Sequence, residues 1–174
     1  MILEFTKVNK NAITPTRSNP SDAGLDLYAN LNDNPIVIKP FENKMIPTGL
    51  RFGIPHGYML QVCNRGSMGA KRSLVVGAHI IDSGYDGEVF IDLHNIGSVP
   101  QTIADGNKIA QVVLVPVVHF RAQENKSGDL YEGQGLTISN RGDGSLGSTD
   151  RKKAASISLA DLYMRDKHPR WNQD

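Results

Sequence analysis

At 174 residues, 39% of them hydrophobic and 21% charged, the chain can form one domain with a buried core, and it is neither a disordered chain nor a membrane protein. The single cysteine, Cys63, excludes a disulfide framework and a zinc site made of several cysteines, and it fits a cytoplasmic location. Residues 1–150 carry 13 basic and 15 acidic side chains, so no nucleic-acid binding is expected of the body, while residues 151–174, with 6 basic and 3 acidic side chains, form a basic extension of unassigned role.

Short alternating or β-branched runs separated by glycine and proline dominate the first 120 residues. Strands are expected at 2–8, 35–40, 45–46, 50–52, 58–63, 88–95 and 108–120, the last one interrupted by Pro116. Strands of this length, with turn residues roughly every 8–12 positions, predict an all-β sandwich or barrel. A short helix is expected to follow Ser67.

The composition changes after Asn125. Residues 126–150 are rich in glycine and serine, which predicts an exposed, flexible arm. Residues 156–165 have the apolar spacing of a short helix. The expected organisation is a β domain over 1–125, a glycine-rich arm over 126–150 and a basic C-terminal extension over 151–174.

Two segments could bind an anion. In the sequence AGLDL, Asp26 lies between apolar residues, although an aspartate at a strand edge can also simply hold a turn. In RGSMGAK, the basic residues Arg65 and Lys71 frame Gly66 and Ser67, whose backbone N–H groups can approach a ligand closely. A plain turn that starts a helix is the alternative for this second segment.

Two further segments could complete a nucleotide site. The sequence GAHIIDSGYDGE at 77–88 predicts a β-hairpin with an acid, Asp82, and an aromatic ring, Tyr85, at its tip. The acid could act as a general base and the ring could stack on a sugar or base, or the aspartate could make local turn hydrogen bonds. The sequence RGDGSLGST from Arg141 offers a charge, hydroxyls and backbone N–H groups to a triphosphate, although its composition alone favours a flexible linker.

Taken together and in this order, these segments resemble the motifs of the homotrimeric dUTPases, with GNKIAQ at 106–111 as the fourth of five. The resemblance covers about residues 20–150. It implies a jelly-roll-like, distorted β-barrel that assembles as a homotrimer with active sites at the subunit interfaces. It also implies hydrolysis of dUTP to dUMP and pyrophosphate, with Mg²⁺ bridging the phosphates and a C-terminal arm that closes over the substrate.

The resemblance further implies roles for individual residues. Asp82 would activate the water that attacks the α-phosphorus, Tyr85 would pack against the deoxyribose, and Asp26 would organise the catalytic and metal-bound waters. The other residues expected to contact the substrate are Arg65, Gly66, Ser67, His79, Ile81, Gln111, Arg141, Gly144, Leu146, Gly147 and Ser148.

Three positions depart from the family pattern. Gly66 stands where a serine is usual, Leu146 stands where a phenylalanine stacks on uracil, and His79 stands where glycine is common. These departures concern the phosphate contacts and the stacking on the base more than the fold.

The departures also keep two alternatives open. The pair Ala78 and His79 resembles the dCTP deaminases, which share the fold and would place a catalytic glutamate where this chain has Asp92. One position argues against a deaminase: that family would place an arginine five residues after Arg65, and this chain has Ala70 there. A nucleotide-gated regulatory binding protein on the same fold is the third hypothesis, and dUTP hydrolysis is the preferred one.

Overall fold

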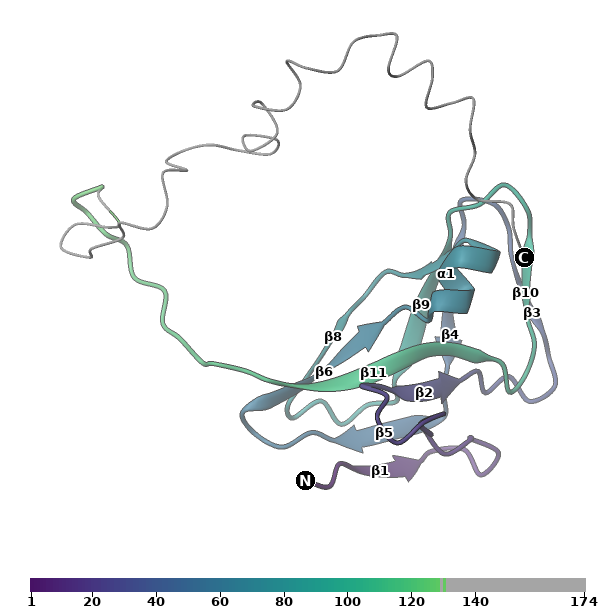
Figure 1. Ribbon diagram of the computed structural model, residues 1–174, viewed down its shortest axis with the longest axis horizontal. Coiled ribbons are helices and arrows are strands. Elements are labelled where there is room, and N and C mark those ends of the chain that lie inside the picture. Colours follow the sequence, from purple (N-terminus) through teal and green to yellow (C-terminus); the bar gives the residue numbers. More distant parts are fainter. Residues whose placement is uncertain (129, 131–174) are drawn as a thin grey trace, which may run out of the picture. The chain divides into compact units, whose positions relative to one another are not determined.

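The computed structural model describes residues 1–128 and residue 130. Its elements are β1 Glu4–Lys7, β2 Leu25–Tyr28, β3 Ile36–Ile38, β4 Asn43–Pro47, β5 Leu50–Gly53, β6 Tyr58–Cys63, α1 Gly66–Arg72, β7 Leu74–Val76, β8 Ile80–Asp82, β9 Phe90–Asn95, β10 Gln101–Ile103 and β11 Lys108–Pro116 (Figure 1). The predicted all-β class is therefore confirmed. Within these residues, no helix has the length and hydropathy to cross a membrane.

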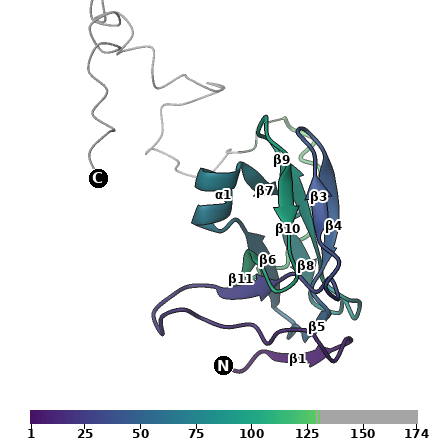
Figure 2. The same cartoon turned by 90° about the vertical axis from the view of Figure 1, so that its right-hand side faces the viewer.

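The described strands pair antiparallel in four sheets. The largest has the order β2-β11-β6-β8, a second has the order β4-β9-β7, and β1-β5 and β10-β3 form two-stranded sheets. The helix α1 lies beside β7 (Figure 2). The four-stranded sheet matters most for function, because it contains or directly precedes most of the predicted site residues that the structure describes.

The core follows the period of two that strands impose on side chains. In β9, Ile91 and Leu93 are fully buried, whereas the residues between and beside them, Asp92 and His94, lie on the opposite face. Fully buried aliphatic side chains come from most of the strands: Leu27, Ile38, Ile46, Leu50, Leu60, Leu74, Ile91, Leu93, Ile103 and Ile109. This shared core fixes the register of the strands, since a slip of one residue would turn these side chains to the solvent.

Several predicted elements are confirmed with shifted ends. The helix after Ser67 is α1, and the run from Lys108 ends as a strand at Pro116 because a proline has no N–H to continue the ladder. The strand expected at 2–8 is limited to β1, whose four residues are all exposed. Three short strands, β2, β7 and β10, were not expected, since runs of three or four residues give too little alternation to identify.

The prediction of a β-hairpin at 77–88 was wrong. β8 pairs with β6, residues 83–88 form no strand, and β9, which begins at Phe90, pairs with β4 and β7 in another sheet. Both edges of β9 are already occupied, and the chain turns after Asp82, where the Tyr85 N–H donates to the Asp82 carbonyl oxygen. The segment is called the 77–88 loop from here on.

The C-terminal predictions are not tested. The helix expected at 156–165, the basic extension and most of the glycine-rich arm lie outside the described residues, as do Arg141, Gly144, Leu146, Gly147 and Ser148. The division of the chain at about residues 125 and 150 stays a prediction.

Candidate active site

One row across the four-stranded sheet gathers the polar residues of three predicted segments. In the ladder, Asp26 of β2 lies opposite Gln111 of β11, and Gln111 lies opposite Cys63 of β6. Arg65 follows two residues after Cys63, where the chain leaves the sheet. Non-local strand pairing thus brings residues 26, 65 and 111 together.

Asp26 is the electrostatic centre of this row. Its Oδ1 lies 2.8 Å from Arg65 Nε and its Oδ2 lies 2.7 Å from Lys108 Nζ, and its side chain is only 12% exposed. Burial alone would raise the pKa of Asp26, but the hydrogen bond from Lys108 and the charge of Arg65 outweigh burial and hold this pKa below its usual value. The bond to Asp26 in turn raises the pKa of Lys108.

The turn after Arg65 is fixed in place by α1, the helix that begins at Gly66. Arg65 is the N-cap residue of α1 with an extended backbone, and its side chain reaches Asp26 instead of capping the helix. Met68 is buried against the core, and Arg72 donates through Nε to Gln101 Oε1 at 3.0 Å. Gly66 and Ser67 therefore lie in the first turn of an anchored helix, where backbone N–H groups lack partners within the helix.

These residues line an open pocket of about 440 Å³, named here the charged pocket. Its lining residues are Ser18, Asp22, Ala23, Gly24, Asp26, Arg65, Gly66, Ser67 and Gln111. Gly24 is required at the floor, since a Cβ there would lie 2.6 Å from Gln111 Oε1. Gln111 is oriented by its other amide atom, because Nε2 donates to the Asn64 carbonyl oxygen at 2.9 Å.

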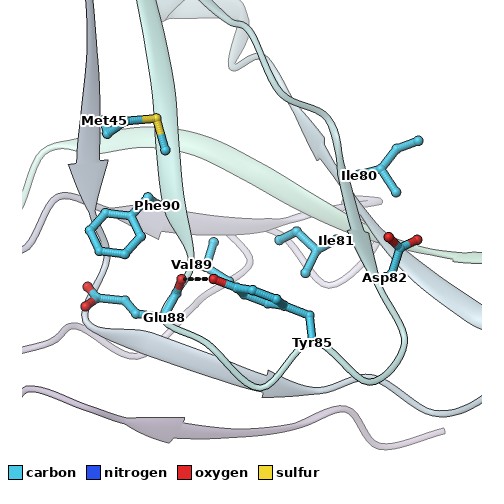
Figure 3. Close-up of a pocket in the computed structure, with 8 residues that line it drawn as sticks. All are labelled: Met45, Ile80, Ile81, Asp82, Tyr85, Glu88, Val89 and Phe90. Carbon is cyan, nitrogen blue, oxygen red and sulfur yellow. Dashed lines mark hydrogen bonds between the residues drawn. The ribbon is translucent and has the colours of Figure 1, made fainter.

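A second cavity, of about 230 Å³, lies against the 77–88 loop and is named here the apolar pocket. It is lined by Met45, Ile80, Ile81, Asp82, Tyr85, Glu88, Val89 and Phe90 (Figure 3). In Figure 3, the Tyr85 ring lies across the space between β8 and the start of β9, and its hydroxyl donates to the Glu88 carbonyl oxygen at 2.9 Å. Gly87 permits this position, since a Cβ there would lie 2.4 Å from the Tyr85 hydroxyl.

Asp82 ends β8 at the rim of the apolar pocket, and its side chain is exposed. The next residue fixes the loop, because Ser83 Oγ donates to the Ile54 carbonyl oxygen at 3.1 Å. β8 is an edge strand of its sheet, so the backbone edge that does not face β6 is turned away from the ladder. Such an edge can offer N–H and C=O groups to a planar, polar ligand.

The two pockets have no lining residue in common, and the strand register puts them far apart. Asp82 lies opposite Met59, which is four positions before Cys63 on β6, and β8 is three strands from β2. Three strand spacings of about 4.8 Å and four residues of about 3.4 Å separate Asp26 from Asp82 by roughly 20 Å. Within one chain, these two carboxylates are too far apart to act on the same phosphorus.

Two other residues of interest lie outside both pockets. His79 Nδ1 is 2.9 Å from the Val62 carbonyl oxygen, so its ring is held against β6. The carboxylate of Asp92 accepts from Asn43 Nδ2 at 2.8 Å and lies 2.9 Å from His94 Nε2. Burial would raise the pKa of Asp92, but the Asn43 hydrogen bond and His94 hold it low. The carboxylate at the position of the deaminase glutamate is thus bound to two neighbouring side chains, Asn43 and His94.

Sequence reasoning missed some of the site. Lys108, in the fourth motif, was given no role, and its position near Asp26 depends on the pairing of β2 with β11, in which Lys108 lies opposite Tyr28, two residues after Asp26. Met45 and Phe90 were read as ordinary strand residues, although their 55% and 44% exposure and their place in the apolar pocket mark them as wall residues. Only the pairing of distant strands reveals these positions.

A metal ion is expected of this fold family, and the charged pocket can be tested for one. Among the described residues, no three or more His, Cys, Asp or Glu side chains gather as a metal cage. The pocket does offer carboxylate and amide oxygens, from Asp22, Asp26 and Gln111. Oxygen donors of this kind suit Mg²⁺, which keeps several waters and binds through one or two carboxylates and substrate phosphates.

Comparison with known proteins agrees with this geometry. The family model described as dUTPase matches residues 10–149. The deoxyuridine 5'-triphosphate nucleotidohydrolase of Clostridium novyi is 34% identical over 151 residues, covering 86% of this chain and 99% of the relative. That of Gloeobacter violaceus is 37% identical over 137 residues, covering 78% and 87%.

A solved structure is also similar over most of the chain. It is the dUTPase of Staphylococcus bacteriophage 80alpha with dUPNHPP, described among phage dUTPases that control transfer of virulence genes by a G protein-like mechanism. It is 25% identical, has a TM-score of 0.72 and covers 84% of this chain and 97% of its own. With the family model and the curated relatives, this match establishes that the chain belongs to the dUTPase family.

Proposed function

We propose that this chain hydrolyses dUTP to dUMP and pyrophosphate, at sites that combine the apolar pocket of one copy with the charged pocket of another. The names of its relatives support the activity. The observation that carries the composite site is the separation of Asp82 from Asp26 by roughly 20 Å across the sheet. A second copy would supply the missing half, and the resemblance to the homotrimeric dUTPases makes three copies with three such sites the proposed assembly.

The nucleoside would enter the apolar pocket. Uracil has an N–H donor flanked by two carbonyl acceptors, and the free backbone edge of β8 near Ile81 presents the complementary pattern. Tyr85 would pack against the deoxyribose, and the hydrogen bond to Glu88 holds its ring in the space that a 2′-hydroxyl would need. His79 would contribute only through its backbone N–H, because its ring lies against the Val62 carbonyl oxygen and its own carbonyl oxygen accepts from the Val62 N–H.

The triphosphate would lie in the charged pocket. Arg65 and Gln111 would donate to phosphate oxygens together with the backbone N–H groups of Gly66 and Ser67. Arg141, Gly144, Leu146, Gly147 and Ser148 of the arm would close over the substrate and exclude bulk water. Because Arg65 is already paired with Asp26, the phosphates would share this guanidinium instead of capturing a free one.

The chemical step needs a base and a stabilised leaving group. Asp82 would accept a proton from a water molecule whose oxygen forms a bond to the α-phosphorus. The bond between the α-phosphorus and the bridging oxygen then breaks, and the electron pair leaves with pyrophosphate. Arg65 and Gln111 would stabilise the charge that develops on the leaving phosphates, which is the main contribution a protein makes to phosphoryl transfer.

When bound with the substrate, Mg²⁺ would supply positive charge that offsets the charge of the phosphates. Both oxygens of Asp26 already accept hydrogen bonds from cations, so Asp26 would contact the ion through water without losing its ion pairs. Asp22, also in the charged pocket, is engaged by the Asn19 backbone N–H at 2.8 Å and would take a similar outer position.

The test is a panel of nucleotides incubated with the full chain, with and without Mg²⁺, and analysed by product. Pyrophosphate and dUMP from dUTP are expected, with little turnover of dCTP, dTTP or UTP. Release of ammonia from dCTP would instead support a deaminase. The carboxylate of Asp92, the residue that would be catalytic in a deaminase, is already bound to Asn43 and His94, which argues against this activity. Nucleotide binding with neither product would support a regulatory binding protein.

A regulatory role is the second candidate, and it is compatible with the first. The similar phage dUTPase is described as controlling gene transfer, and the basic extension at 151–174 adds charge that hydrolysis does not need. The cytoplasm, where Cys63 would stay reduced, is the proposed location.

A further inference from the structure

Asn64 joins the strand that ends at Cys63 to the elements on both sides of it. Its side-chain Oδ1 accepts a hydrogen bond from the Val76 N–H at 2.7 Å. Its backbone carbonyl oxygen accepts a hydrogen bond from Gln111 Nε2 at 2.9 Å. β6 ends at Cys63, and Asn64, the next residue, still links the chain to Val76 through its side chain and to Gln111 through its backbone carbonyl oxygen.

The bond to Val76 closes the segment that contains Arg65 and α1. This segment leaves the four-stranded sheet after Cys63 and joins the β4-β9-β7 sheet at β7, so Asn64 lies at its start and Val76 lies at the end of β7. The far side is held separately, where Ile96 N–H donates to the Ser73 carbonyl oxygen. Without the bond between Asn64 and Val76, the backbone of Arg65 would no longer be held in the position from which its side chain reaches Asp26.

The bond to Gln111 settles which way the Gln111 amide faces. Nε2 donates to the Asn64 carbonyl oxygen, and Oε1 packs against Gly24, where a Cβ would lie only 2.6 Å away. The amide group has a second N–H on the same nitrogen. Held in this orientation, Gln111 can offer that hydrogen to an anion in the charged pocket and keeps its carbonyl oxygen on the glycine side.

We infer that Asn64 is a positioning residue, which sets Arg65 and Gln111 for the phosphates through its bonds to Val76 and Gln111. The inference rests on the proposed function of the charged pocket and assigns no contact between Asn64 and the substrate. Small displacements of such groups matter, since an error of about 1 Å in position can cost about 100-fold in rate. The apolar pocket is held at other points, by the pairing of β8 with β6 and by the bond from Ser83 to the Ile54 carbonyl oxygen, and Asn64 takes part in neither of these contacts.

The experiment compares Asn64→Ala with the wild-type chain by binding of two fragments in the presence of Mg²⁺. Pyrophosphate reports on the charged pocket, and deoxyuridine reports on the apolar pocket. The expected result is a pyrophosphate Kd raised about tenfold or more, with the deoxyuridine Kd within about twofold of wild type. Hydrogen exchange of the Val76 amide should accelerate, because its acceptor is gone.

Two further variants keep the test sharp. Asn64→Asp keeps an acceptor for the Val76 N–H, so this amide should stay protected even though the added charge weakens pyrophosphate binding. Asn9→Ala is the matched control, because Asn9 Oδ1 accepts from the Asn11 N–H at 2.9 Å in an exposed turn outside both pockets. It should leave both Kd values unchanged. If Asn64→Ala fails to fold, exposure of the Val76 amide in Asn64→Asp contradicts the inference and protection supports it.

The outcomes separate this inference from the proposed function. Equal pyrophosphate binding by wild type and Asn64→Ala overturns the inference, and so does an equal loss of both fragments, which would indicate general loosening. A wild-type chain that binds neither pyrophosphate nor dUTP overturns both. A wild-type chain that binds pyrophosphate but releases none from dUTP overturns the activity, while the Asn64 comparison still decides the inference.

Discussion

The two pockets of this chain are built in different ways. The charged pocket is held by side chains that pair with one another: Asp26 with Arg65 and Lys108, and Gln111 with Asn64. The apolar pocket is lined mainly by apolar side chains, and its loop is held by bonds to backbone carbonyl oxygens, from Ser83 to Ile54, from Tyr85 to Glu88 and from Arg51 to Asp86. Under the proposed function, the charged half would hold phosphate with side chains that are already paired, and the apolar half would select by shape.

The two pockets would also contribute differently to the energetics of binding and catalysis. In the charged pocket, Asp26 already pairs with Arg65 and Lys108, so a bound phosphate would share these cations, and catalysis would depend on their placement in the transition state. In the apolar pocket, contact area and excluded volume would select the ligand, and Asp82 at its rim is the residue proposed to accept the proton. Substitutions in the two pockets should therefore change different kinetic constants.

The largest effect is expected for Asp82→Asn. The amide keeps the shape of the side chain but cannot accept the proton of water, so kcat should fall about 10²–10⁴-fold while nucleotide binding stays intact. Steady-state kinetics with direct binding of a non-hydrolysable dUTP analogue measures both. Asp86→Asn is the control, since Asp86 is in the same loop and is exposed. Retention of more than about a tenth of the activity by Asp82→Asn would exclude Asp82 as the base.

Tyr85→Ala should relax the choice of sugar. Without the ring, a 2′-hydroxyl fits, and the preference for dUTP over UTP should fall by up to about 100-fold. Competition between the two nucleotides measures it. Tyr85→Phe removes the hydroxyl that donates to Glu88 but keeps the ring, so it should retain most of the preference. Equal selectivity in wild type and Tyr85→Ala would remove Tyr85 from this role.

Lys108→Met should make the protein less stable to unfolding by acid. The pKa of Asp26 is held below its usual value, so its ion pairs stabilise the fold above about pH 4 and are lost as the pH falls through the folded pKa. Removing Lys108 moves this pKa upward, so the midpoint of acid unfolding, followed by circular dichroism, should move to higher pH. Lys44→Met removes the exposed pair with Glu42 and is the control. The prediction fails if the two variants shift the midpoint equally.

The smallest effect is expected for Leu146→Phe, which lies outside the described residues. An aromatic ring over a base contributes at least about 1 kcal/mol, so the Kd for dUTP should tighten about fivefold. Binding of pyrophosphate should stay unchanged, because stacking needs the base. A dUTP Kd that is unchanged or weaker would indicate that the arm docks differently or that another residue covers uracil.

Local patterns in the sequence were enough for part of this picture. The alternation around Ile91 predicted β9, and the small residues after Arg65 predicted α1, since both depend on neighbours in the chain. The approach of Gln111 to Asp26 could be expected only from the family resemblance, because it arises from the pairing of β2 with β11. The residues of that row are 85 positions apart in the sequence, and no local signal sets their register.

The error at 77–88 has the same origin. A glycine-punctuated segment with an acid and an aromatic ring in its turn is typical of a hairpin, but only Ile80–Asp82 forms a strand here, and this strand pairs with β6, which comes earlier in the chain. The sequence also does not reveal the partners of Asn64, because Val76 and Gln111 come from other strands. Contacts inside a segment were predictable, and contacts between segments were not.

The central claim is that one active site takes its apolar pocket and its charged pocket from different copies. It is tested most directly by co-assembling two inactive variants, Asp82→Asn and Arg65→Ala, by mixing them unfolded in equal amounts and refolding them together. In random oligomers, about a quarter of the sites combine an intact Asp82 with an intact Arg65 from different chains, so about a quarter of the wild-type activity should return. If both pockets of one site belonged to a single chain, no site could regain both residues and the mixture would stay inactive.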